Sequence, residues 1–134
     1  MIRVTLDTNI LVSAFLYSGN ERRALQAAIQ GKFKSITSLD ILDELGEVLT
    51  RLGVEEREVE GYLLRVMEIS EVHLPERLDD VKIRDREDVK ILECARSGAS
   101  DYIVTGDEDL LSLKEYKGMK IIRSNELLSL LKID

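Results

Sequence analysis

Two aspartates in this chain follow apolar segments that have the character of β-strands. Asp7 comes directly after residues 2–6, and Asp107 follows residues 102–105 with one glycine between them. Ligands of open α/β sheets bind beyond the carboxyl ends of the parallel strands, so we expect both carboxylates at one edge of a sheet. Carboxylates gathered in one site repel each other unless cations are present. The pattern therefore predicts a divalent-metal site, whose commonest use is metal-assisted phosphodiester chemistry.

Three further acids are expected near that edge. Glu44 borders the apolar stripe of a predicted helix, whereas Asp40 and Glu47 point away from that stripe. Asp85 and Asp88 stand where another helix should begin. Each acid also has a purely structural explanation, because aspartate caps helices and acids are favoured in a first helical turn. With 26 acids in the chain, some coincidence is expected.

Strand-like and helical segments alternate along the chain. Predicted strands cover residues 2–6, 33–37, 71–74, 102–105 and 120–122. Predicted helices cover residues 10–16, 21–30, 38–52, 55–69, 88–96, 110–113 and 124–131, and Ser124 is expected to cap the last one. This alternation predicts a three-layer α/β/α fold with a central, mainly parallel sheet of about four to five strands.

Composition narrows the classes of protein to which the chain could belong. Its 134 residues suit one domain, and an apolar content of 44% argues against intrinsic disorder. Cys94 and His73 are the only cysteine and histidine, which excludes a disulfide framework or a Cys/His zinc site within one chain. No signal peptide or membrane-spanning run is recognisable, so we expect a cytoplasmic protein with no membrane partner. The net charge of −7 argues against a simple nucleic-acid-binding module, although bound divalent ions would offset part of that charge.

Four motifs in a fixed order resemble those of PIN-domain nucleases, in particular the VapC-like toxin components of toxin–antitoxin systems. They are VTLDTNILVSAFL near the start, SLDILDELGEVLTR and DREDVKILECA in the middle, and DYIVTGDEDLL near the end. The final KIIRSNELL segment also fits the pattern. Because the resemblance covers essentially the whole chain, it implies a single PIN-like nuclease domain over residues 1–134.

The resemblance also implies a role for individual residues. The catalytic and metal-binding acids of the family fall on Asp7, Glu44, Asp88 and Asp107. Asp85 and Asp109 fall where many members carry additional acids, and Thr8, Asn9 and Thr105 fall at polar positions that support the metal or contact the substrate. Arg86 stands where members often have a small residue or proline, which leaves the role of Asp85 open.

The implied chemistry is hydrolysis of RNA with Mg²⁺ or Mn²⁺ as cofactor, because these ions prefer oxygen ligands. The implied partners are an RNA substrate, an antitoxin protein and a second copy of the chain in a homodimer or larger assembly. Such chemistry needs no histidine and no covalent nucleophile.

Other functions compete with this interpretation. A phosphatase could use Asp7 as its nucleophile, but the second acid typical of haloacid-dehalogenase enzymes is replaced by Asn9. A non-catalytic PIN-like module that binds a metal or a protein would suit the acidic charge and the absence of Trp. A nucleophilic pair of Cys94 and His73 has no third group to orient it.

Overall fold

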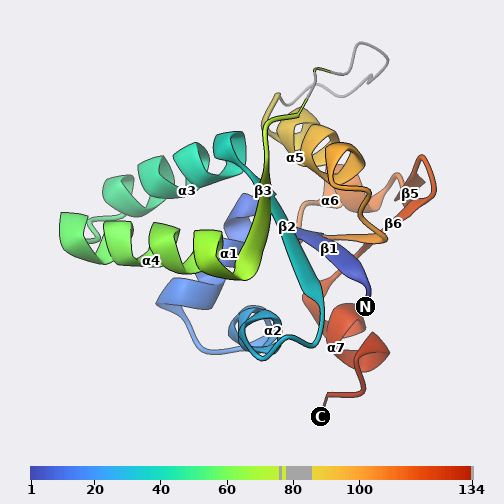
Figure 1. The fold of residues 1–134 in the computed structure, drawn as a ribbon, viewed down its shortest axis with the longest axis horizontal. Coiled ribbons are helices and arrows are strands. Elements are labelled where there is room, and N and C mark those ends of the chain that lie inside the picture. The colour runs from blue at the N-terminus through green and yellow to red at the C-terminus, as the bar shows by residue number, and fades with distance from the viewer. Residues whose placement is uncertain (76, 78–85, 134) are drawn as a thin grey trace.

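A sheet of six strands occupies the middle of the computed structural model, which describes residues 1–75, 77 and 86–133 (Figure 1). The strands are β1 (Arg3–Leu6), β2 (Lys34–Ser38), β3 (Ser70–His73), β4 (Tyr102–Val104), β5 (Glu115–Tyr116) and β6 (Met119–Ile122). Their order across the sheet is β3-β2-β1-β4-β6-β5. Every neighbouring pair is parallel except β5 and β6, which confirms the predicted mainly parallel α/β fold.

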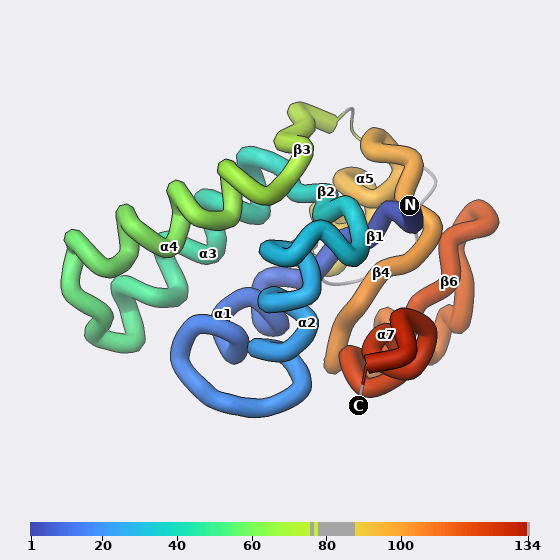
Figure 2. The backbone as a smooth tube through the Cα atoms, turned by 60° about the horizontal axis from the view of Figure 1, so that its bottom comes forward, coloured from blue at the N-terminus to red at the C-terminus, as the bar shows by residue number. Residues whose placement is uncertain are grey.

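Seven helices accompany these strands within the described parts of the chain, and the last of them follows β6. They are α1 (Thr8–Leu16), α2 (Asn20–Ile29), α3 (Leu39–Arg51), α4 (Glu56–Ile69), α5 (Arg86–Ser97), α6 (Glu108–Leu111) and α7 (Ser124–Leu130). β1 and β2 lie between α5 and α2 in both views, and α3 and α4 form a helical pair at one end of the molecule (Figures 1 and 2). None of the helices in the described ranges is long and apolar enough to cross a membrane.

The direction in which strands are added changes at β1. From β1 the chain adds β2 and β3 on one side, and it then returns to add β4 and β6 on the other side. Leu6 pairs with Val104 across this junction, and the backbone N–H of Asp7 donates to the carbonyl of Val104 at 3.0 Å. In open α/β sheets a crevice forms at such a switch point, beyond the carboxyl ends of the strands. The topology therefore places the residues after β1 and β4 where a ligand site is expected.

Helix α3 shows how the apolar stripe orients an acid. Leu42, Leu45 and Leu49 are buried along the predicted stripe, whereas Leu39 and Leu52 at its two ends are exposed. The side-chain oxygen of Ser38 caps the helix by accepting from the N–H of Ile41, as one of the two predicted caps. Because the buried stripe fixes the rotation of the helix, Glu44 on its border is directed to one side of the core.

Two local features differ from the predictions. One strand of the sheet, β5, was not predicted, because a segment of two residues is too short to show an alternating pattern. It pairs with β6 through a hairpin in which Lys117 and Gly118 both have positive φ, the conformation that tight hairpins require. The prediction that Ser124 caps the last helix is wrong. Arg123 is the N-cap, and its N–H donates to the Glu126 carboxylate at 3.1 Å.

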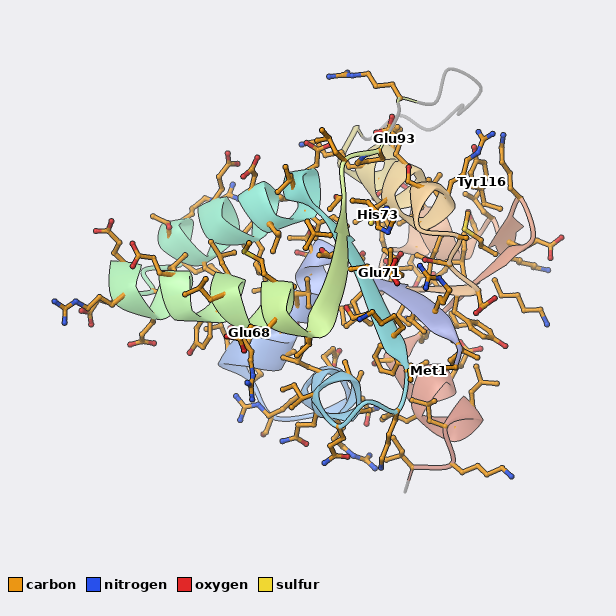
Figure 3. All side chains as sticks on the ribbon, viewed as in Figure 1. Met1, Glu68, Glu71, His73, Glu93 and Tyr116 are labelled. Carbon is orange, nitrogen blue, oxygen red and sulfur yellow. The ribbon has the colours of Figure 1, made fainter. Side chains whose placement is uncertain are left out.

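A charged network ties the carboxyl end of α5 to the sheet. Arg3 donates through Nη1 and Nη2 to the two carboxylate oxygens of Glu71 at 2.8 and 2.7 Å, and through Nε to the carbonyl of Gly98 at 2.9 Å. His73 lies 3.2 Å from Glu71, and Figure 3 shows these two side chains together on β3. The hydrogen bonds from Arg3 and then His73 lower the pKa of Glu71 to about 2. The network thus joins β1, β3 and the residue that follows α5.

Gly98 allows the close approach of α5 to the sheet. A Cβ atom at this position would lie 2.2 Å from Cγ2 of Ile36, which is fully buried on β2. We expect Gly98→Ala to lower the free energy of unfolding by about 1–3 kcal/mol, because the buried side chain or the helix must move. Chemical denaturation of the purified protein measures this change.

Gly61→Ala is the matched control, because Gly61 lies within α4 and a Cβ there would meet no atom within 4 Å. Alanine favours a helix interior by about 0.5–1 kcal/mol over glycine, so this variant should be as stable as the wild type or more stable. Equal stability of Gly98→Ala and the wild type would show that α5 is not closely packed on β2.

Candidate metal centre

A small pocket of about 60 Å³ opens at the switch point of the sheet. It is lined by Asp7, Thr8, Asn9, Glu44, Asp88, Ile91 and Asp107. Its acids come from four separate elements, namely the residue after β1, α3, α5 and the residue before α6. The structure thus brings together the four acids for which the sequence predicted a catalytic role. The sequence also predicted Asp85 and Asp109 as ligands. Asp85 lies outside the described residues.

Asp7 is the most enclosed acid of the pocket wall, with 5% of its surface exposed. One carboxylate oxygen caps α1 by accepting from the N–H groups of Asn9 at 2.6 Å and Ile10 at 3.3 Å. Burial raises the pKa of Asp7, hydrogen bonds from Thr105 and from the two N–H groups oppose that rise, and the charge of Asp107 adds to it. Ionised Asp7 is therefore costly here until a positive charge is nearby.

Thr105 links the two aspartates that follow the central strands. Its hydroxyl donates to the second carboxylate oxygen of Asp7 and accepts from the N–H of Asp107 at 3.0 Å. Asp107 in turn caps α6 by accepting from the N–H groups of Asp109 at 2.8 Å and Leu110 at 3.4 Å. Because Thr105 is fully buried, its hydroxyl has little freedom to turn away from this role. The capping roles given as structural alternatives are therefore real, and they coexist with a place in the pocket.

A compact group of three carboxylates consists of Asp88, Asp107 and Asp109. One oxygen from each lies within 4.8 Å of the other two. Asp88 is buried, Asp107 is half-buried and Asp109 is exposed, so the group extends from the pocket to the surface. Oxygen atoms at such separations suit a hard divalent cation better than they suit three unshielded negative charges.

A buried hydroxyl also points to a ligand in this pocket. Thr8 is 2% exposed and lines the pocket, yet its Oγ1 has no hydrogen-bond partner among the described residues. Buried polar groups are nearly always hydrogen-bonded, and leaving one unsatisfied costs about 1–3 kcal/mol. A hydrated cation or a substrate oxygen would satisfy this hydroxyl. The donor set and the unsatisfied hydroxyl thus fit a divalent metal with oxygen ligands.

The comparison with protein families agrees with this geometry. The model of the PIN domain family matches residues 3–109, which include β1, β4 and the acids of the pocket wall. The chain belongs to the PIN domain family. PIN domains are usually nucleases and typically bind divalent metals, and the carboxylate cluster of this member lies where the fold creates its crevice.

A solved structure shares the fold. The crystal structure of PAE2754 from Pyrobaculum aerophilum superposes with a TM-score of 0.64 over 98% of this chain and 97% of that one, at 20% sequence identity. No match was found among curated proteins.

The sequence did not predict Ile91 as a lining residue, nor the position of Arg123 near the end of β4. Ile91 contributes an apolar side to the pocket, one helical turn after Asp88, and a helical repeat could have shown that the two share a face. Arg123 follows β6, so the rule that pointed to Asp7 and Asp107 also applies to it. An arginine at the end of a strand is not by itself typical of a metal site, so its residue type gave no signal.

Cys94 and His73 lie apart from this chemistry. Cys94 is fully buried, and burial raises the pKa of its thiol to about 12, which keeps it protonated at neutral pH. His73 on β3 is engaged with Glu71. Neither residue is among those that line the pocket.

Replacing Thr105 tests the link between the two aspartates. Thr105→Val keeps the shape of the side chain but leaves an oxygen of Asp7 and the N–H of Asp107 without their partner. We expect a loss of about 1–3 kcal/mol in the free energy of unfolding, while Thr105→Ser should retain most of the stability. Denaturant titration of both variants in metal-free buffer measures the difference. A Val variant as stable as the Ser variant would mean that the hydroxyl is not needed to hold the two carboxylates.

Proposed function

We propose that this PIN domain, over residues 1–134, is an endoribonuclease that hydrolyses RNA phosphodiester bonds with Mg²⁺ or Mn²⁺. The single observation that supports this most is the convergence of Asp88, Asp107 and Asp109 within 4.8 Å beside the pocket that Asp7 and Glu44 complete. Capping or solvation would account for any one of these acids. Neither requires five of them at one edge of the sheet.

The acids of the site would contribute to cation binding in different ways. Asp88, Asp107 and Asp109 would supply ligands, Asp7 would supply negative charge from the floor of the pocket, and Glu44 would approach from α3. When bound, a divalent metal makes a water molecule more acidic and neutralises charge that develops on a phosphate. We assign Asp7, Glu44, Asp88 and Asp107 as the catalytic residues, with Asp109 as a further metal ligand.

Other side chains of the pocket wall would orient the ligands and the substrate. Thr105 fixes the carboxylate plane of Asp7 and the start of α6 through its two hydrogen bonds. Thr8 has a hydroxyl available for a water or a phosphate oxygen, and the exposed side chain of Asn9 can donate to an RNA backbone. Ile91 limits the space open to water on the side of α5.

The phosphatase alternative fits the structure less well. A nucleophilic carboxylate needs an oxygen free to attack, whereas both oxygens of Asp7 accept hydrogen bonds, one from α1 and one from Thr105. The non-catalytic module remains the relevant alternative, and loss of activity on mutation separates it from the nuclease.

Conservative substitution of the acids tests the nuclease. Asp107→Asn keeps the cap of α6 but removes a charge from the cluster, and Glu44→Gln removes a charge from α3. We expect both to reduce Mn²⁺-dependent cleavage of a labelled single-stranded RNA by at least about a hundredfold, the scale expected when transition-state charge stabilisation is lost. Gel electrophoresis of the products, with and without chelator, measures the rate.

Glu47→Gln is the control for this experiment, because Glu47 lies exposed on α3, one turn from Glu44. It should cleave at the wild-type rate. Wild-type protein that cleaves nothing in Mn²⁺, or acid variants that cleave as fast as wild type, would contradict the nuclease and favour the binding module.

The biological role that we propose follows from the resemblance to VapC-like proteins. It is that of a cytoplasmic toxin that forms a homodimer or larger assembly and is neutralised by an antitoxin protein. The same variants test this role. Expression of the wild type without an antitoxin should arrest growth of the host, and Asp107→Asn should not. Normal growth with an active nuclease would contradict the toxin role alone.

A further inference from the structure

Arg123 lies beside the acidic pocket through its place in the sheet. It directly follows β6, which pairs in parallel with β4 so that Ile122 is opposite Val104. The N–H of Thr105 donates to the carbonyl of Ile122 at 3.0 Å. The main chain of Arg123 is therefore next to Thr105, whose hydroxyl contacts Asp7 and the N–H of Asp107.

The side chain of Arg123 reaches the same region. Its Nη2 lies 2.5 Å from Oε1 of Glu108, the residue that follows Asp107 at the start of α6. Backbone pairing and the side-chain ion pair are independent contacts: the first places the main chain of Arg123 beside Thr105, and the second places its guanidinium beside Glu108, next to Asp107 in the chain. None of the described residues that line the pocket carries a positive charge. A polyanionic substrate therefore meets only acids inside the pocket, and a cation at the rim is needed to hold its neighbouring phosphates.

We propose that Arg123 binds a backbone phosphate of the RNA beside the scissile bond, and that Glu108 holds the guanidinium ready and releases it to the phosphate. This inference rests on the proposed nuclease function. A guanidinium presents two parallel N–H donors that match the oxygens of a phosphate as well as those of a carboxylate. Rotation of the Arg123 side chain is enough to exchange the Glu108 carboxylate for an RNA phosphate.

The exposure of the ion pair makes this exchange easy. The side chain of Arg123 is 48% exposed and that of Glu108 is 79% exposed. Exposed ion pairs contribute little to stability, so the fold does not depend on this one. The main chain at Arg123 is held separately, since its N–H donates to Glu126. Replacing the side chain should thus leave the start of α7 in place.

The chain contains a matched control pair. Arg65 and Glu68 form an exposed ion pair on α4, with side chains 49% and 66% exposed. Figure 3 shows Glu68 on the side of the molecule away from α6. Arg65→Ala therefore removes the same charge, with the same exposure, from a place remote from the pocket.

Steady-state cleavage of a labelled, mixed-sequence single-stranded RNA in Mn²⁺ tests the proposal. We expect Arg123→Ala to raise KM about five- to tenfold with kcat little changed, as for lost binding that is equal in the ground and transition states. Arg123→Lys should recover part of the loss, and Glu108→Gln should leave KM unchanged or lower it. Arg65→Ala should match the wild type, and thermal melting should confirm that all four variants are folded.

Salt-dependent binding separates this inference from the nuclease assignment. RNA binding is measured at several KCl concentrations in the Asp107→Asn background, which is expected not to cleave, and in that background combined with Arg123→Ala or with Arg65→Ala. Loss of one phosphate contact should reduce the slope of log affinity against log salt by about 0.7. Cleavage by the wild type, together with equal KM and equal slopes for Arg123→Ala and Arg65→Ala, would overturn the role of Arg123 alone. A changed slope without wild-type cleavage would retain the phosphate contact and reject the nuclease.

Discussion

The parallel pairing of β1 with β4 is the constraint on which the site depends. It brings the ends of two strands almost a hundred residues apart in the chain to the same edge, and an aspartate follows each strand. Both aspartates cap a helix with one oxygen, so the start of the helix fixes the direction of the carboxylate. Thr105 then joins the two through one buried hydroxyl. Helices α3 and α5 need only present one acid each toward this fixed pair.

Burial and repulsion between the carboxylates of the pocket lower the stability of the metal-free protein. Burial and the neighbouring charge of Asp107 both make ionised Asp7 costly, and Asp107 itself has oxygens of Asp88 and Asp109 within 4.8 Å of one of its own. Proteins retain such arrangements where function requires them, and the cost is offset when the ligand binds. The negative net charge is in part a consequence of this site. Divalent cations bound at the site would offset part of this charge, so the net charge does not exclude a polyanionic substrate.

Much of the fold could be predicted from the sequence because hydrophobic periodicity reports burial. The five longer strands and all seven helices follow directly from their apolar patterns, and Gly53, Gly98 and the serine before α3 mark boundaries. The β5 strand could not be predicted in this way, because two residues carry no period. The N-cap at Arg123 could not be predicted from its residue type, because its N–H donates to the Glu126 carboxylate and arginine is not a usual capping residue.

The acids of the site could be predicted by type and approximate place, but their spatial relations could not. Asp109 is expected from the sequence only as an additional acid, yet among the described residues it forms a compact carboxylate group with Asp88 and Asp107, whereas the oxygens of Asp7 are engaged by Thr105 and α1. Such distinctions depend on rotamers and on the short α6 helix, which leave little signal in the order of residues. Arg123 illustrates the same limit, since its position beside Thr105 comes from the strand next to it in the sheet and not from its neighbours in the chain.

Calorimetric titration of Mn²⁺ into the metal-free protein tests the central claim most directly, because it asks whether the carboxylates form a cation site without assuming any reaction. Saturable binding by the wild type is expected, with affinity reduced at least about tenfold in Asp109→Asn and unchanged in Glu47→Gln. The absence of saturable binding by the wild type, or equal affinity in all three proteins, would contradict the account.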